Sequence, residues 1–168
     1  GFPESNIIRC GHPYHDNVRA AGAVLENEGR SKLRSQLFPD AGSRPVILFL
    51  GEISDGLNSA QYSKSAEYTL TGRGKSTGRT QIVTEEGLEA VAELAERPYL
   101  AVRPHPKNTD VELGPYYASF DLVVRAGGAL ELVFAADLVV GMSTSLLVEA
   151  ALLQRPTLAV VPRAVERD

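Results

Sequence analysis

The sequence has very little cysteine, no excess of positive charge and no long apolar run. Cys10 is the only cysteine in 168 residues, so the chain cannot form an internal disulfide framework, which fits a reducing cytoplasm. The formal net charge of -4 gives no global basic field that would attract nucleic acid or an anionic membrane. No apolar segment approaches the roughly 18 residues of a membrane-spanning helix. These absences predict a cytoplasmic protein, and any association of the full-length protein with the inner membrane would be peripheral.

The chain also lacks an initiator methionine, since it opens on Gly1 and an apolar segment follows almost at once. No signal peptide is visible at its start. A length of 168 residues suits one domain with a core of its own. We therefore expect residues 1–168 to form a single domain that is a fragment of a longer protein.

Potential metal ligands are scarce as well. His12 and His15, followed by Asp16, have a spacing that would suit a metal, but no second cluster of cysteine or histidine supplies the remaining ligands. We expect no metal and no cofactor. The segment is interpreted instead as a loop in which Asp16 or Asn17 caps the next helix.

The glycine-rich, basic segment between Leu57 and Thr80 contains Gly-Lys-Ser but is not a P-loop. That motif needs a glycine five residues before Gly74, where this chain has Thr69, and no buried strand leads into it. Two interpretations stay open for its cations, which are Arg73, Lys75 and Arg79. They could close over a phosphate as part of a lid, or they could be solvated surface charge.

The most informative stretch runs from Ala135 to Pro162. Asp137 to Gly141 is a short apolar run that predicts a strand buried on both faces of a parallel sheet. Ser143, Thr144 and Ser145 precede a helix-forming segment that Arg155-Pro156 ends, and residues 157–161 predict a second buried strand. The hydroxyl cluster therefore lies at a helix N-terminus, where it could bind a phosphate or simply cap the helix.

Strands and helices alternate along the rest of the chain. Strands are expected at residues 6–10, 45–51, 99–103 and 120–124, with the run at 45–51 central and buried. Helices are expected at 18–37 with a break at Gly22 or Gly29, from Thr84 as cap to Arg97, and at 129–134. This order predicts the α/β class, as a Rossmann-like three-layer α/β/α fold with a parallel sheet of about five or six strands.

Polar residues follow three of the predicted strands. Gly51, Glu52, Ser54 and Asp55 come after the first central strand, and Arg103, His105 and Lys107 end or follow the next. Because the carboxyl ends of parallel strands meet at one edge, we expect these groups and the hydroxyl cluster to form one cleft for a nucleotide phosphate. A plain polar turn is the alternative for the segment around Glu52.

Three segments, LFLGEISDG, RPHPKN and DLVVGMSTSLLVEAALLQRPTLAVVP, resemble in order the C-terminal, donor-nucleotide-binding half of GT-B glycosyltransferases. The pairing of a His-Pro motif with a Ser/Thr cluster is most similar to bacterial sialyltransferases, CDP-glycerol glycerophosphotransferases and capsule-polysaccharide enzymes. The first segment, IIRCGHPYHD, resembles the G-N-P-x-x-D stretch that begins this half-domain, with His12 where asparagine is usual.

The resemblance implies a glycosyltransferase or glycerophosphotransferase of cell-surface polysaccharide synthesis. It implies that His105 donates to the departing phosphate as the catalytic group, while Glu149 binds the ribose hydroxyls of the donor. The other substrate-binding residues expected are Gly51, Glu52, Ser54, Arg103, Lys107, Ser143, Thr144 and Ser145. The partners implied are a nucleotide-activated sugar or another CMP-, CDP- or UDP-type donor and a missing N-terminal acceptor domain, which supplies the catalytic base. This chain alone would then bind donor and catalyse little or nothing.

Two other functions stay open at this point. A UDP-sugar 2-epimerase-like half would share the fold and would need carboxylates that face the sugar, for which Glu52, Asp55 and Glu149 are the candidates. A non-catalytic nucleotide-binding or regulatory α/β domain would bind nucleotides weakly or not at all.

Overall fold

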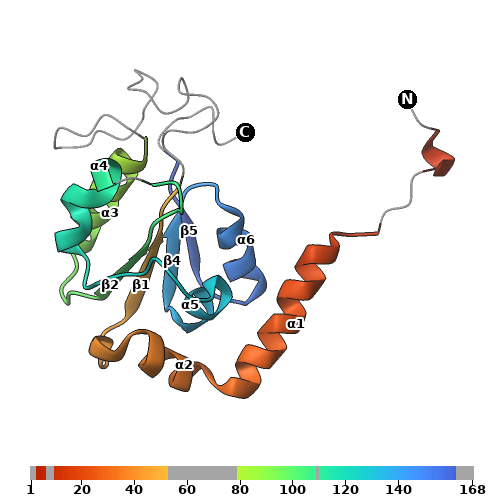
Figure 1. Ribbon diagram of the computed structural model, residues 1–168, viewed down its shortest axis with the longest axis horizontal. Helices are drawn as coiled ribbons and strands as arrows, with labels where there is room; N and C mark the ends of the chain where they lie inside the picture. Colours follow the sequence, from red (N-terminus) through yellow and green to blue (C-terminus); the bar gives the residue numbers. More distant parts are fainter. Residues whose placement is uncertain (1–2, 7–9, 53–78, 109, 162–168) are drawn as a thin grey trace.

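The computed structural model describes residues 3–6, 10–52, 79–108 and 110–161. Within these residues one sheet contains five parallel strands in the spatial order β3-β2-β1-β4-β5 (Figure 1). The strands are β1 (Val46–Leu50), β2 (Tyr99–Arg103), β3 (Leu122–Val123), β4 (Leu138–Gly141) and β5 (Thr157–Ala159). This is the Rossmann order, in which the direction of progress along the sheet reverses between β1 and β4. The predicted α/β class and the parallel sheet are confirmed.

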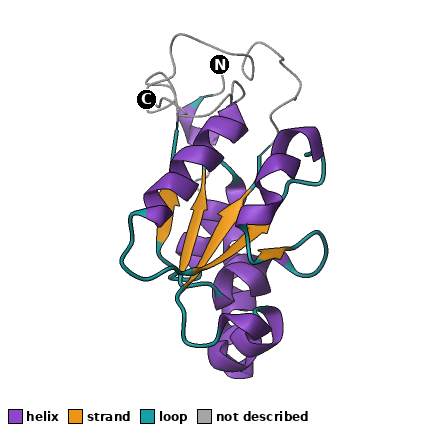
Figure 2. Cartoon of the chain, turned by 90° about the vertical axis from the view of Figure 1, so that its left-hand side faces the viewer, coloured by secondary structure: helices purple, strands orange, loops and turns teal. Residues whose placement is uncertain are grey.

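Helices cover both faces of the twisted sheet, whose strands fan out in Figure 2. One face carries α1 (Pro13–Glu28), α2 (Arg30–Leu37), α5 (Ala129–Ala135) and α6 (Ser145–Leu152), and the other carries α3 (Arg79–Ala92) and α4 (Asp110–Leu113). Short 3-10 turns occur at η1 (Glu4–Asn6), η2 (Pro39–Ala41) and η4 (Gly114–Ser119). No described helix combines the length and the apolarity that crossing a bilayer requires.

The alternation of side chains along β1 divides the core into two clusters. Val46, Leu48 and Leu50 pack with α1, α2, α5 and α6, whereas Ile47 and Phe49 pack with α3 and η4 on the other face. All five residues of β1 are buried, as predicted for a central strand with helices on both sides.

The tetrapeptide Asp-Leu-Val-Val occurs twice, at Asp121 and at Asp137, and both aspartates bind the neighbouring strand in the same way. The Asp121 carboxylate accepts the N–H of Leu100 at 2.8 Å, and its own N–H donates to the Leu100 carbonyl at 2.8 Å. Asp137 repeats this exchange with Val46 at 2.8 and 2.9 Å. Each aspartate therefore fixes the register at the amino end of a strand pair.

The predicted break in the first helical segment occurs at Gly29, where a φ of 93° ends α1 and α2 begins at once. Gly22 instead stays inside α1, because α6 passes so close that a Cβ at this position would lie 2.7 Å from Leu153 Cδ2. The two glycines thus serve different purposes, since one allows a turn and the other allows close packing of α1 on the body of the domain.

Three predicted boundaries are wrong. Of the strand expected at 6–10, Asn6 ends η1 and Cys10 belongs to no strand, while residues 7–9 lie outside the described residues. The segment 12–17 is not a loop, since Pro13 begins α1 with His12 as N-cap, and neither Asp16 nor Asn17 caps it. Thr84 does not begin a helix either: α3 starts at Arg79, and the Thr84 hydroxyl donates to the Thr80 carbonyl at 2.7 Å inside it.

The strand expected at 157–161 exists as β5, but it is not buried. β5 lies at the edge of the sheet beside β4, and all three of its residues are exposed. Its apolar composition suggested a central strand, and strand order, which the sequence pattern does not specify, put it at the edge.

Candidate functional site

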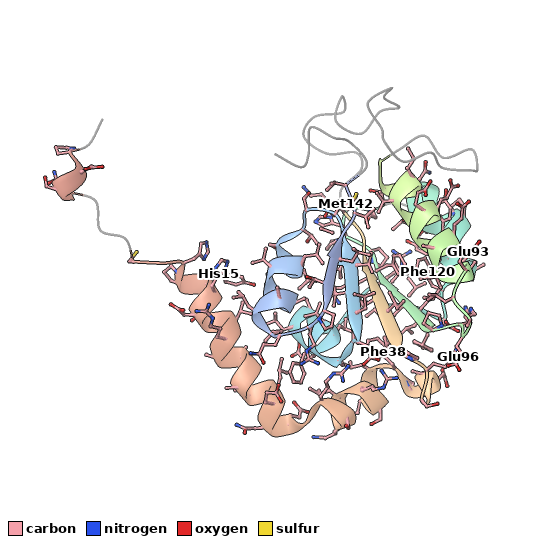
Figure 3. All side chains as sticks on the ribbon, turned by 180° about the vertical axis from the view of Figure 1, so that it is seen from behind. His15, Phe38, Glu93, Glu96, Phe120 and Met142 are labelled. Atoms are coloured by element: carbon pink, nitrogen blue, oxygen red, sulfur yellow. The ribbon has the colours of Figure 1, made fainter. Side chains whose placement is uncertain are left out.

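The carboxyl ends of β1 and β4 meet through Glu52, at the point where the strand order reverses. Glu52 is only 8% exposed, and its Oε1 accepts the N–H of Met142 at 3.1 Å and the N–H of Ser143. Its Oε2 accepts the Ser143 hydroxyl at 3.0 Å. The turn before α6, which was predicted to hold a phosphate, is thus already occupied by a carboxylate of the protein. Figure 3 shows Met142 at this edge of the sheet and Phe38 at the opposite end.

The loop after β2 is tied to the same place by Asn108. Its Oδ1 accepts the N–H of His105 at 2.7 Å, and its Nδ2 donates to the Glu52 carbonyl at 2.6 Å. The buried hydroxyl of Thr80 also donates to that carbonyl, at 3.4 Å. Neither residue was predicted as part of the site, although asparagine is a common turn former and its place in the His-Pro loop was a usable signal.

Gly51 lies where these two segments approach most closely. A Cβ on Gly51 would lie 2.6 Å from Asn108 Oδ1 and 2.9 Å from the His105 backbone nitrogen. The position therefore accepts only glycine without a shift of the His105 loop. Close packing thus explains why residue 51 is a glycine. Contact between Gly51 and a ligand stays a prediction.

His105 is partly exposed, and a hydrogen bond selects its tautomer. Nδ1 accepts the N–H of Lys107 at 3.1 Å, so Nε2 carries the proton in the neutral ring. The Lys107 side chain itself is exposed. A histidine oriented in this way presents an N–H donor to a ligand at neutral pH.

Arg103, the last residue of β2, has two terminal guanidinium nitrogens, Nη1 and Nη2, that differ in their hydrogen bonding. Nη2 donates to the Gly127 carbonyl at 3.1 Å, while Nη1 is buried and makes no hydrogen bond with the described residues. A buried guanidinium nitrogen without an acceptor is uncommon and marks a place where an anion would be favourable.

The hydroxyl cluster divides into three roles at the start of α6. Ser143 donates its hydroxyl to Glu52. Thr144 is the N-cap, with its Oγ1 accepting the N–H of Leu146 at 3.4 Å, and Ser145 is the exposed first residue of α6. The capping interpretation is therefore right for Thr144, whose hydroxyl proton is still available for a second bond.

Glu149 lies one turn along α6, on the side that faces α1. The residue is 7% exposed, and its Oε1 accepts the hydroxyl of Tyr14, from the first turn of α1, at 2.9 Å. Among the described residues, no other hydrogen bond to the Glu149 side chain occurs. Its contact is thus with α1 and not with Glu52 or His105, and sequence reasoning missed Tyr14 because the two residues lie 135 positions apart.

The two histidines at the start of α1 stack on each other rather than converge on a metal. The ring centroids of His12 and His15 are 4.3 Å apart, and His12 meets the Tyr14 ring edge-on at 6.3 Å. Among the described residues no three His, Cys, Asp or Glu side chains are grouped so that they could hold a metal ion.

The structure does not place several of the predicted residues. Ser54, Asp55, Arg73 and Lys75 lie outside the described residues, and Arg79 is the first residue of α3. The described site therefore consists of Glu52 with Ser143, the His105 loop joined to it through Asn108, and the start of α6.

The bond between Tyr14 and Glu149 predicts an altered titration. The hydrogen bond to Glu149, assisted by desolvation and by the negative charge of that carboxylate, raises the pKa of Tyr14 above its ordinary value of 10.0. We expect Glu149→Gln to lower the pKa of Tyr14, because the charge disappears while the shape is retained. NMR titration of tyrosines labelled at Cζ measures this, and Tyr14→Phe assigns the signal. The same Tyr14 pKa in both proteins would contradict the contact.

The sequence matches no known protein-family profile, and no curated protein matches it. The chain is similar to several solved structures, two of which are described here. The β-Kdo 2,7-transferase KpsC of Thermosulfurimonas dismutans is 18% identical with a TM-score of 0.45, over 86% of this chain and 44% of that one. A variant of the wall teichoic acid polymerase TagF is 18% identical with a TM-score of 0.47, over 93% of this chain and 34% of that one. The chain thus spans less than half the length of either protein. Similarity at this level does not establish an activity, so function has to be argued from the site.

Proposed function

We propose that this chain is the donor-nucleotide-binding half of a GT-B glycosyltransferase or glycerophosphotransferase that acts in the synthesis of a cell-surface polysaccharide. The observation that carries the proposal is the junction made by Glu52. It joins the ends of β1 and β4 at the switch point of a Rossmann-ordered sheet, and Asn108 brings the His105 loop to the same junction. Open α/β sheets bind their ligands at this place.

In this proposal the donor phosphate lies between the start of α6 and the His105 loop. The hydroxyls of Thr144 and Ser145 and the N-terminal end of α6 offer donors on one side. On the other side are the protonated Nε2 of His105 and the unoccupied Nη1 of Arg103. Together they would stabilise the charge that develops on the phosphate as the glycosidic bond breaks. The sequence resemblance assigns the catalytic base to the missing acceptor half.

Other predicted residues receive supporting roles in the proposal. Ser143 already gives its hydroxyl to Glu52, so this pair shapes the turn and leaves contact with the phosphate to Thr144 and Ser145. Glu149 accepts the ribose hydroxyls, with Tyr14 holding its other carboxylate oxygen. Gly51 and Lys107 are assigned to the border of the phosphate site in the proposal, while Ser54 lies outside the described residues.

The position of Glu52 favours a transferase over an epimerase-like enzyme. A 2-epimerase needs carboxylates that face the sugar, whereas both oxygens of Glu52 are bonded to the turn before α6. The non-catalytic alternative is separated from the transferase by nucleotide binding itself.

Calorimetric titration with CMP, CDP, UDP and their sugar conjugates tests the proposal. We expect at least one of them to bind, and His105→Ala and Ser143→Ala each to weaken binding about tenfold, which is about 1.4 kcal/mol. His105→Ala removes a donor to the phosphate, and Ser143→Ala loosens the turn that positions Thr144 and Ser145.

Ser35→Ala is the matched control, because it removes a serine hydroxyl that bonds within α2, away from the carboxyl edge of the sheet. It should leave binding unchanged. If none of the nucleotides binds, the donor-site function is wrong. If one binds equally well to the His105 and Ser143 variants, the function stands and the residue assignment is wrong.

A further inference from the structure

Three aromatic rings lie together at the start of α1. The imidazoles of His12 and His15 are stacked with their centroids 4.3 Å apart, and the Tyr14 ring meets His12 edge-on at 6.3 Å. Tyr14 is 48% exposed, and neither core cluster of the described residues includes it. Packing of the core therefore does not explain this group of rings, which we call the aromatic corner.

The aromatic corner lies beside a buried carboxylate that has one unbonded oxygen. The Tyr14 hydroxyl donates to Oε1 of Glu149 at 2.9 Å, and Glu149 is 7% exposed. Its Oε2 accepts no hydrogen bond from the described residues, and they do not enclose it fully. A largely buried carboxylate with an accessible, unbonded oxygen is a good acceptor for a hydroxyl group of a ligand.

Two contacts show that the aromatic corner lies near the end of α6 at which the proposed phosphate site is found. Tyr14 meets Glu149, and further along both helices Gly22 approaches Leu153, so α1 and α6 run in the same direction. The start of α1 therefore lies towards the carboxyl edge of the sheet, where α6 begins at Ser145 (Figure 1). Glu149 follows one turn later, about 6 Å along the helix axis.

We propose that the aromatic corner is the subsite for the nucleobase of the donor, with the base stacked on the exposed ring of Tyr14. The base of a nucleotide is joined to the ribose carbon next to the one that carries the 2′-hydroxyl. A ribose whose hydroxyls bind Glu149 therefore brings its base to Tyr14, while the phosphates extend back to the start of α6. Stacking on aromatic rings is a common way to bind a base, and the edge-on His12 limits its position.

This inference rests on the proposed donor-nucleotide function, which supplies the phosphate site and the ribose contact. The alternative for Tyr14 is a purely positioning role, in which its hydroxyl holds Glu149 and its ring contacts no ligand. The two differ in one measurable respect. A stacked ring strengthens binding only of ligands that contain a base, whereas a positioning hydroxyl strengthens binding of every ligand that contains the ribose.

Calorimetric titration with CDP, UDP and ribose 5-diphosphate tests the proposal, because ribose 5-diphosphate keeps the sugar and both phosphates and lacks only the base. We expect CDP or UDP to bind the wild type about tenfold more tightly than ribose 5-diphosphate. Tyr14→Leu should remove most of this preference, since leucine has no ring on which a base can stack. Tyr14→Phe should keep the preference, although loss of the bond to Glu149 weakens binding of all three ligands alike.

Tyr116→Leu is the matched control. The Tyr116 hydroxyl also donates to a glutamate, Glu85, at 2.8 Å, but on the α3 side of the sheet. This variant should leave all three affinities unchanged, and circular dichroism shows whether each variant is folded.

The outcomes separate the base subsite from the donor function. If CDP or UDP binds and Tyr14→Leu keeps the preference over ribose 5-diphosphate, the base subsite is wrong and the donor function stands. The same conclusion follows if the wild type shows no such preference, or if Tyr14→Phe loses it as fully as Tyr14→Leu. If none of the three ligands binds, the donor function is wrong and the base subsite with it.

Discussion

Glu52→Ala is expected to lower the free energy of unfolding by about 3 kcal/mol, because it removes a carboxylate that accepts two N–H groups and one hydroxyl. The N–H groups of Met142 and Ser143 and the Ser143 hydroxyl all donate to this one carboxylate. Met142 and Glu52 are buried, so water cannot fully replace the lost acceptor. Urea denaturation followed by circular dichroism measures the change.

The comparison with Glu52→Gln separates shape from charge. Glutamine keeps one oxygen for the two N–H groups and loses the charge, so about 1 kcal/mol of destabilisation is expected. Glu93→Ala, which removes an exposed glutamate next to α3, is the control and should cost almost nothing. If Glu52→Ala were as stable as Glu93→Ala, the carboxylate would not hold the turn, and the junction on which the proposed donor site rests would be in error.

Asp137→Ala is the second substitution with a large expected effect, about 2 kcal/mol of lost stability. Val46, whose N–H the carboxylate accepts, is fully buried at the centre of the sheet, so its N–H would have no acceptor. The same carboxylate pairs with Arg30 and Arg34, which dock α2 against the amino end of the sheet. Denaturant unfolding of the variant measures the loss, and equal stability would contradict this role.

The pH dependence of stability tests the same group by another route. Partial burial opposes ionisation of Asp137, but the bond from Val46 and the charges of Arg30 and Arg34 outweigh it and hold its pKa below the ordinary 3.8. Burial also opposes ionisation of Asp121. The hydrogen bond from the Leu100 N–H and the charges of Arg97 and Arg44 outweigh burial and lower the pKa of Asp121. A carboxyl group whose pKa is lower in the folded protein than in the unfolded chain stabilises the folded protein. This stabilisation is complete at pH values above the pKa in the unfolded chain, which is about 4. That stabilisation is lost as the pH falls through the folded pKa.

We therefore expect the stability difference between the wild type and Asp137→Asn to be largest near neutral pH and to shrink as the pH falls below the unfolded pKa of about 4. Asp16→Asn is the control, since the Asp16 side chain is 72% exposed and meets only Arg19 in the same helix. A difference that stays constant from neutral to acid pH would show that ionised Asp137 contributes nothing to the fold.

Much of the fold was predictable because local patterns are strong where strands are buried on both faces. The continuous apolar runs of β1 and β4 and the break at Gly29 were predicted correctly. The errors occur where the same residue type suits two different structures. Pro13 begins α1 in a segment that looked like a polar loop, and Thr84, a good cap by type, lies inside α3 with its hydroxyl bonded to the Thr80 carbonyl.

The sequence predicted that the polar groups at the carboxyl ends of the strands would lie together, but not how they would bond. Glu52, His105 and Ser143 were selected because the carboxyl ends of parallel strands share one edge, and bonds through Asn108 do connect them. The sequence did not indicate that Glu52 would take both the N–H and the hydroxyl of Ser143, nor that Tyr14 would reach Glu149. Such bonds depend on the side-chain directions of residues that lie 91 and 135 positions apart in the chain.

The amino-acid sequence by itself determined the class of fold and the edge at which polar groups gather, because hydrophobic periodicity and strand direction are local properties of the chain. The tertiary structure alone decided the strand order, and with it that β5 is an exposed edge and that Glu52 meets the start of α6. The physical reason is that pairing between strands, and the hydrogen bonds of buried carboxylates, depend on which segments become neighbours in space. The hydrophobic periodicity of a single segment does not specify which other segments become its neighbours.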